Sequence, residues 1–111
     1  MLNRSAVTVR MKQPFLDWLN SLPDPPDCTL ELLNRDPPVY LLPFVDFQDQ
    51  QEDLLEDFYD LIFEDRLAGW WTVEEDWPRD RTFKMFKEWF ECKFSSIVQD
   101  LVDGEPLGLE M

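Results

Sequence analysis

Two short stretches of the chain carry apolar residues in patterns typical of β-strands. From Ala6 to Lys12 apolar and polar residues alternate, with Val7, Val9 and Met11 on one side. Alternation with a period of two, rich in β-branched residues, favours a half-buried strand. From Val39 to Val45 both faces are apolar, which predicts a buried strand packed beside the first. The proline inside this second stretch has to lie near the strand's end, where no ladder N–H is needed.

Two short helices are predicted between these strands. Pro14 opens the stretch from Pro14 to Leu22, and proline suits a first helical turn because an N–H there has no intrahelical partner. Thr29 is a suitable N-cap for a brief helix that runs through Arg35. The three prolines between Pro23 and Asp27 restrict the backbone strongly and predict a rigid connector between the two helices.

A long acidic helix is predicted from Asp46 to Arg66, and Gly69 follows it where a left-handed C-terminal cap is expected. On a helical wheel of 100° per residue, one broad face is apolar and faces the core. Its members are Phe47, Leu54, Leu55, Phe58, Leu61 and Ile62. The opposite arc is filled by carboxylates, namely Asp49, Glu52, Asp53, Glu56, Asp57, Asp60 and Glu64.

A second long helix is predicted near the C-terminus, with Asp80 as its N-cap. It follows a single helical turn at Thr72 to Glu75, which matches a capping box and is ended by Trp77-Pro78. The apolar residues of the second helix recur at helical spacings and form a narrow seam. They are Phe83, Phe86, Phe90, Phe94, Ile97 and Leu101.

An alternative ends this helix near Cys92 and makes Phe94 to Val102 a third strand, because Ser95 to Val98 are poor helix formers. In either case the patterns predict one α+β domain over residues 1–103. A small two- or three-stranded antiparallel sheet is packed by two long amphipathic helices and several short ones. Residues 104–111 contain two glycines and a proline and are expected to form a flexible tail.

The charge narrows the choice of partners. A net charge of −14 on 111 residues argues against direct binding of nucleic acid or anionic membranes, because both would be repelled, and it permits a basic protein partner. The longest apolar run, Val39 to Leu42, is too short to span a bilayer, and the first twelve residues lack the apolar run of a signal peptide. We therefore expect a cytoplasmic protein, bacterial as a working assumption, in which Cys28 and Cys92 are free thiols rather than a disulfide.

The composition removes many kinds of catalysis. The chain has no histidine, so serine and cysteine triads that depend on histidine, and the usual zinc ligand sets, are absent. Its three glycines cannot build a nucleotide-binding loop. We expect no cofactor, no metal site and no catalytic residue, and the chain is predicted not to be an enzyme.

The acidic helix is the candidate binding surface. Carboxylates three and four residues apart on a helix lie about 5–6 Å from one another, close to the spacing of phosphates along a nucleic-acid strand. Such a helix would fit the basic groove of a nucleic-acid-binding protein, or a basic toxin. Two aromatic residues fall on or beside the acidic arc, where they would serve as anchors within a charged rim. The predicted contact residues are Asp53, Glu56, Asp57, Tyr59, Asp60, Phe63 and Glu64.

Two other functions are kept as alternatives. Met85, Trp89 and Cys92 form a second apolar strip, so the helix that carries them is either buried centrally or uses Met85 and Trp89 in a homodimer. The other alternative is a hydrolase-type enzyme with a buried carboxylate of raised pKa in an aromatic cleft. Trp70, Trp71 and Trp77 would line that cleft.

The pairs Trp70-Trp71 and Trp77-Pro78, with the Phe and Trp spacing that follows them, resemble a group of small acidic bacterial proteins with no assigned activity. This resemblance covers the C-terminal half of the chain. It implies a compact α+β domain and carries over no catalytic residue.

Overall fold

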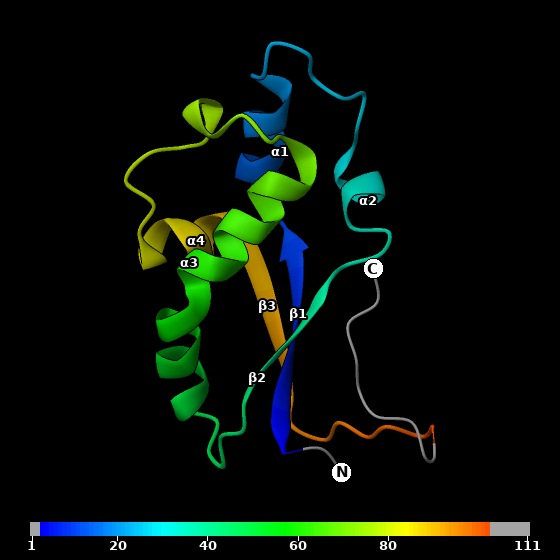
Figure 1. Cartoon of the computed structure of the whole chain (residues 1–111), viewed down its shortest axis with the longest axis vertical. Helices are drawn as coiled ribbons and strands as arrows, with labels where there is room; N and C mark the ends of the chain where they lie inside the picture. The colour runs from blue at the N-terminus through cyan, green and yellow to red at the C-terminus, as the bar shows by residue number, and fades with distance from the viewer. Residues whose placement is uncertain (1–2, 103–111) are drawn as a thin grey trace.

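A three-stranded antiparallel sheet and four α-helices make up the described part of the chain (Figure 1). The computed structural model describes residues 3–102. In chain order the elements are β1 (Arg4–Met11), α1 (Gln13–Asn20), α2 (Leu30–Leu33), β2 (Val39–Pro43), α3 (Gln50–Trp70), a 3-10 turn (Glu74–Asp76), α4 (Phe83–Trp89) and β3 (Phe90–Ser95). The predicted α+β class is confirmed, while the predicted tail at 104–111 lies outside the described residues.

The first strand lies at the centre of the sheet, with β2 and β3 as its two edges. Both neighbours are antiparallel to it, and the register places Val7 opposite Tyr40 on one side and Phe94 on the other. Because side chains alternate along a strand, Val7 and Val9 point to the same face, and both are fully buried. This face of β1 is the floor of the core.

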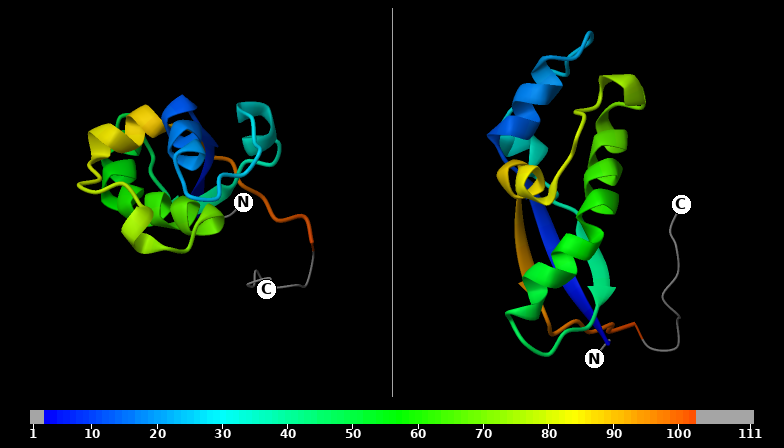
Figure 2. Two further views of the ribbon diagram at one scale, coloured as in Figure 1. Left: turned by 90° about the horizontal axis from the view of Figure 1, so that it is seen from above. Right: turned by 90° about the vertical axis from the view of Figure 1, so that its left-hand side faces the viewer.

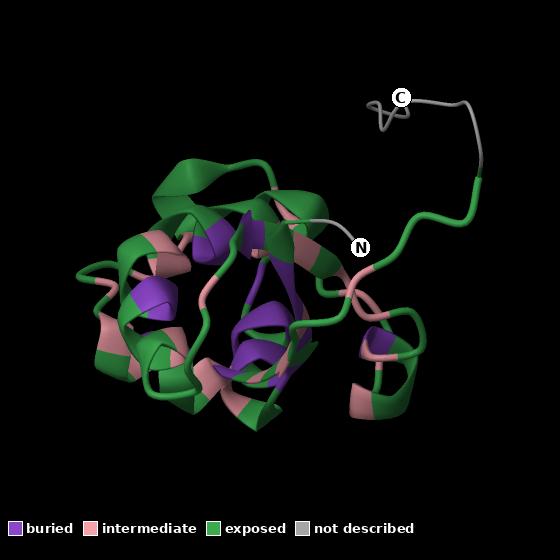
Figure 3. Ribbon diagram, turned by 90° about the horizontal axis from the view of Figure 1, so that it is seen from below, coloured by how far each residue is buried: buried purple, intermediate pink, exposed green. Residues whose placement is uncertain are grey.

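Helices α1, α3 and α4 supply most of the rest of the core (Figure 2), with Leu33 of α2, Leu42 of β2 and Phe90 of β3 also buried in it. Figure 3 shows the buried residues gathered along the central strand and on the sides of the helices that face it. Phe63 of α3 lies at the middle of an aromatic cluster, with ring centroids 6.1 Å from Phe86, 5.1 Å from Phe90 and 5.5 Å from Trp89. Such edge and tilted pairs add to the stabilisation that burial provides.

The predicted second long helix is wrong in its C-terminal half. Helix α4 ends at Trp89, and the backbone turns extended at Phe90 to form β3. A third strand exists, as the alternative predicted, but it spans Phe90–Ser95 rather than Phe94–Val102, and residues 96–102 form neither strand nor helix. A spacing of four keeps two residues on one face of either a helix or a strand, so Phe90 and Phe94 fit both structures. The segment forms a strand because the edge of β1 offers hydrogen-bonding partners to its backbone N–H and C=O groups.

The helix caps are partly as predicted. The Thr29 hydroxyl accepts a hydrogen bond from the Leu32 N–H at 3.2 Å, which confirms that N-cap. Asp80 is not a cap and adopts a left-handed φ of 54°; the Met85 N–H donates instead to the Thr82 hydroxyl at 3.1 Å. The predicted turn after Thr72 exists as a 3-10 turn, but without a side-chain cap.

The predicted bounds of α3, the predicted burial of β2 and the predicted state of the cysteines can also be compared with the structure. Helix α3 is present but starts at Gln50 and continues to Trp70, so Gly69 lies inside it rather than at its cap. Strand β2 pairs with β1 and ends at Pro43 as expected, but it is an edge strand, and Leu41 on it is exposed. Cys28 and Cys92 are both free thiols.

Candidate functional site

Helix α3 buries two rows of side chains that wind around it. One row comprises Leu54, Phe58 and Ile62, and the other comprises Leu55, Tyr59, Phe63 and Leu67. Residues four apart advance by about 40° around the helix, so the buried side at the end of α3 differs from the buried side at its start. Helix α4 and the loop before it pack closely against α3 at Tyr59 and Phe63, which brings both side chains into the buried side.

The two predicted aromatic anchors are therefore not exposed. Phe63 has no exposed surface, so its assignment as a contact residue is wrong. Tyr59 is half-buried; its ring lies 5.5 Å from that of Phe83 and its hydroxyl donates to the Arg81 carbonyl at 3.4 Å. Conversely, Phe47 and Leu61 were expected in the core and are 67% and 59% exposed.

The predicted carboxylates are all exposed, but they differ in their partners. Glu64 accepts from the Arg81 guanidinium at 3.1 Å, and Glu52, in the first turn of α3, pairs with Lys87 of α4. The other five form no ion pair within residues 3–102, namely Asp49, Asp53, Glu56, Asp57 and Asp60. The spacing of the last four places them along one side of α3, and we call these four the carboxylate ridge.

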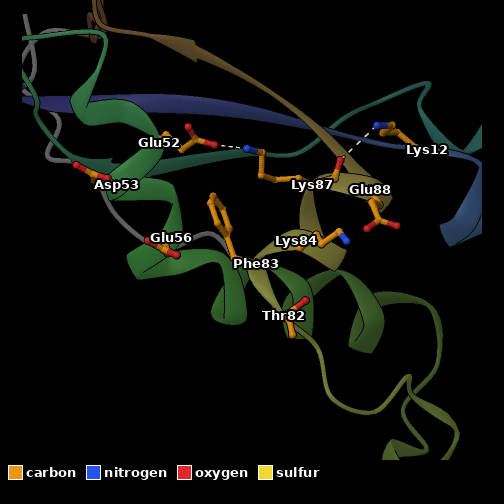
Figure 4. A pocket seen from close by; sticks show the side chains of 9 residues that line it. All are labelled: Lys12, Glu52, Asp53, Glu56, Thr82, Phe83, Lys84, Lys87 and Glu88. Carbon is orange, nitrogen blue, oxygen red and sulfur yellow. Dashed lines mark hydrogen bonds and ion pairs between the residues drawn. The ribbon is translucent and has the colours of Figure 1, made fainter.

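A groove of about 810 Å³ runs between the ridge and helix α4 (Figure 4). In Figure 4 the Phe83 ring stands between the two helices, with Glu52 and Glu56 on the α3 side and Lys84 and Lys87 on the α4 side. The remaining lining residues are Lys12, Asp53, Thr82 and Glu88. The Lys12 ammonium closes one end by donating to the Lys87 carbonyl at 3.3 Å.

The charges of this groove are mixed, whereas the ridge beside it is purely acidic. The Lys87 ammonium lies 5.3 Å from the centroid of the Phe83 ring and also pairs with Glu52, so one acidic side chain of the groove is already neutralised. A cationic ligand would therefore be attracted first to the ridge, with Phe83 as the nearest aromatic surface.

The arrangement required by the enzyme alternative is not found in the described part of the chain. Every aspartate and glutamate there is exposed, whereas that alternative requires a buried one. The tryptophans hold the loop that follows α3, since the Trp71 indole donates to Asp76 and the Trp77 indole donates to the Trp71 carbonyl. Trp70, Trp71 and Trp77 line neither the groove between α3 and α4, nor the groove between β2 and α3, nor the small hollow at Arg10 and Asn34.

The second apolar strip is largely used by the fold. Met85 and Trp89 are partly buried against the core, and the Trp89 ring lies 6.1 Å from Phe15 as well as close to Phe63. Cys92 on β3 is also half-buried, and burial, followed by the neighbouring Glu91 charge, raises the pKa of its thiol to about 12. The homodimer built on Met85 and Trp89 stays a prediction.

The sequence reasoning missed the groove itself. Phe83 was assigned to a core seam that extends along a long helix, but α4 is short and Phe83 is its first residue. Thr82 could have indicated this position. A threonine before an apolar helical pattern is a preferred N-cap, and an N-cap at Thr82 makes Phe83 the first residue of the helix.

No protein-family model, no curated protein and no solved structure matches this chain significantly. Within residues 3–102, no helix has the length and apolar character needed to cross a membrane. The same residues bring together no cluster of cysteine, aspartate and glutamate side chains suited to a metal ion.

Proposed function

We propose that this chain is a protein-interaction module that binds a cationic segment of another protein along the carboxylate ridge of α3. The observation that carries the proposal is the set of four exposed carboxylates, Asp53, Glu56, Asp57 and Asp60, without ion pairs in the described residues. Like charges three or four residues apart destabilise a helix by about 0.2–0.5 kcal/mol per pair. A cationic partner turns that repulsion into attraction.

Phe83 takes the role that the fully buried Phe63 cannot fill. It is partly buried, lines the groove next to the ridge, and is backed by Tyr59 and Phe86 at centroid distances of 5.5 and 6.4 Å. A rigidly backed aromatic side chain loses little conformational freedom on binding and is a common energetic centre of an interface. The ridge would set partner choice and association rate, and Phe83 would slow dissociation.

The partner class follows from the spacing and sign of the ridge. Carboxylates about 5–6 Å apart suit a surface built to hold successive phosphates, so a basic nucleic-acid-binding protein is the favoured partner. The net charge of −14 adds long-range attraction for such a surface.

The test compares two triple variants with the same net charge. One reverses the ridge (Glu56→Lys, Asp57→Lys, Asp60→Lys), and the control reverses three exposed aspartates elsewhere (Asp24→Lys, Asp27→Lys, Asp36→Lys). Each is immobilised and used to bind a fluorescent oligolysine peptide, and then to capture partners from cell extract, at roughly 50 and 500 mM salt.

We expect the control to bind the peptide and partners as the native chain does, and the ridge variant to lose at least about tenfold in affinity at low salt. Equal binding by the two variants would show that only net charge matters, and the proposal would be wrong. Circular dichroism of both variants verifies that α3 remains folded.

A further inference from the structure

A second groove, on the other side of α3, is apolar. It lies between β2 and α3, has a volume of about 270 Å³, and is lined by Tyr40, Leu41, Leu42, Phe58, Leu61 and Ile62. No charged side chain lines it, although the chain as a whole is strongly acidic. Leu41 and Leu61 are both exposed along it. An exposed apolar groove on such a surface favours an uncharged occupant.

The backbone of β2 beside this groove has a free edge. The Val9 N–H donates to the Pro38 carbonyl at 3.0 Å, and hydrogen-bonded pairs alternate along an antiparallel ladder. The pairs Val7–Tyr40 and Ser5–Leu42 are then the bonded ones. The N–H and C=O groups of Val39 and Leu41 therefore point away from β1. Groove and edge together form what we call the apolar docking surface.

The same chain presents an uncovered apolar segment. After β3 the backbone continues as residues 96–102, which leave the body of the molecule (Figures 1 and 2). Ile97 is 72% exposed and Leu101 is 87% exposed, and Val102 is exposed as well. Asp100 is its one charged residue. We call residues 96–102 the arm, and its Ile97-Val98 pair has high β propensity.

The arm does not cover the docking surface of its own copy, because Ile97 and Leu101 of the arm and Leu41 and Leu61 of the surface are all exposed. It starts at β3, on the opposite edge of the sheet from β2. To reach that edge of its own copy, the arm would first have to cross two strand spacings, which takes about 10 Å. The arm of a second copy can lie along β2 without this crossing.

We propose that two copies of this chain form a homodimer by exchanging arms, each arm adding a strand to the free edge of the other copy's β2 and placing its apolar side chains in the β2–α3 groove. A twofold axis makes the two contacts identical and closes the assembly. Main-chain hydrogen bonds to Val39 and Leu41 supply affinity, and the groove selects apolar side chains.

The salt dependence of dimer formation is opposite to the salt dependence of binding a cationic segment. Two copies that each carry −14 charges repel one another, so added salt screens the repulsion and strengthens the dimer. Binding of a cationic segment to the carboxylate ridge weakens with salt. The two proposals therefore fail or succeed independently.

Sedimentation-velocity experiments on a dilution series, at roughly 50 and 500 mM salt, test the exchange. The arm variant is Ile97→Asp with Leu101→Asp, the groove variant is Leu61→Asp, and the control is Leu32→Asp on α2, which introduces the same charge at another exposed leucine. All four positions are exposed, so the monomer fold is retained.

We expect a native dimer that strengthens with salt, a control that behaves like the native chain, and arm and groove variants that dissociate at least about tenfold more readily. An equimolar mixture of the arm and groove variants should recover part of the association, because one intact arm then meets one intact groove. A native chain that stays monomeric at all concentrations and salts, or a dimer that the arm variant does not weaken, would overturn the exchange.

Discussion

The Tyr40 hydroxyl donates a hydrogen bond to the Asp65 carboxylate at 2.5 Å and so fastens β2 to α3. The Arg66 guanidinium completes the cluster, 3.0 Å from the same carboxylate oxygen and 5.8 Å from the centroid of the Tyr40 ring. Burial, and then the bond to Asp65, raises the pKa of Tyr40. The Tyr40 bond is the main cause that lowers the pKa of Asp65.

Replacing Tyr40 by phenylalanine should lower the free energy of unfolding by about 1 kcal/mol at neutral pH, the usual net value of a hydrogen bond. The lowered pKa of Asp65 means that its contribution is present above the ordinary carboxyl pKa and is lost as the pH falls through the folded-state pKa. The raised pKa of Tyr40 means that stability declines once the pH exceeds the ordinary tyrosine value of 10.

Urea unfolding of the native chain and of Tyr40→Phe at acidic, neutral and strongly alkaline pH tests both the acidic and the alkaline loss of stability. The difference between the two proteins should be largest at neutral pH and should shrink toward each extreme. A difference that is constant across pH would mean that the Tyr40–Asp65 bond does not form in solution.

The burial of Phe63 predicts a contrast with Phe47. Phe63→Leu removes part of a ring that is fully enclosed and should cost about 1–2 kcal/mol. Phe47→Leu changes a side chain that is 67% exposed and should stay within about 0.5 kcal/mol of the native chain. Equal costs in chemical denaturation would contradict the winding of the buried rows around α3.

The N-cap of α4 predicts that alanine at position 82 lowers the stability of the fold and that serine at the same position restores most of it. Thr82→Ala should destabilise the fold by about 1 kcal/mol, because the Met85 N–H loses its acceptor. Thr82→Ser keeps the hydroxyl and should restore most of that loss. Thermal unfolding of the two variants measures it, and a serine variant as unstable as the alanine one would assign the loss to the threonine methyl group instead.

The carboxylate ridge predicts a gain in stability from a single reversal. Asp60 is separated by three or four residues from Asp57, Glu56 and Glu64, so Asp60→Lys converts three repulsive pairs into attractive ones. Each reversal removes a repulsion and adds an attraction of about 0.2–0.5 kcal/mol, so the fold should gain about 1–3 kcal/mol at low salt and less at high salt.

The same variant should bind oligolysine more weakly than the native chain, so stability and binding change in opposite directions. Unfolding and peptide titration on one sample measure both. If both fell together, the loss of binding would come from damage to α3 and not from the charge of the ridge.

The Cys92 thiol should react slowly with alkylating reagents in the folded chain. A pKa of about 12 leaves only about one Cys92 side chain in 10⁴ as the reactive thiolate at pH 8. Iodoacetamide labelling followed by peptide mass spectrometry should therefore show slow modification of Cys92 in the native chain and fast modification in urea. Cys28→Ser removes the other thiol, and fast native labelling of that variant would contradict the burial of Cys92.

The sequence predicted the elements whose patterns are local. Strand β1 alternates strictly, and Thr29 caps a helix with its own following residues, so neither depends on distant parts of the chain. The strand β3 was harder, because Phe90 and Phe94 satisfy both a helical and a strand period. The open edge of β1, formed by residues far away in the chain, decided between the two structures.

The sequence predicted which carboxylates of the candidate surface are exposed, but it did not predict which aromatic residues are exposed. A wheel with a fixed angle assumes that one partner lies along the whole helix, whereas α3 packs against the sheet and, at Tyr59 and Phe63, also against α4. The second partner buries Phe63, while Leu61 stays exposed. Wheel geometry alone contains no information on where a second partner begins.

The central position of the N-terminal strand has a consequence for how the chain folds during synthesis. Residue 6 pairs with residue 95 and residue 11 with residue 90, so half of the sheet joins the two ends of the domain. Closing such long loops is slow, because their entropy is lost before the contacts form. The ribosome has to release nearly the whole domain before β1 acquires its second neighbour.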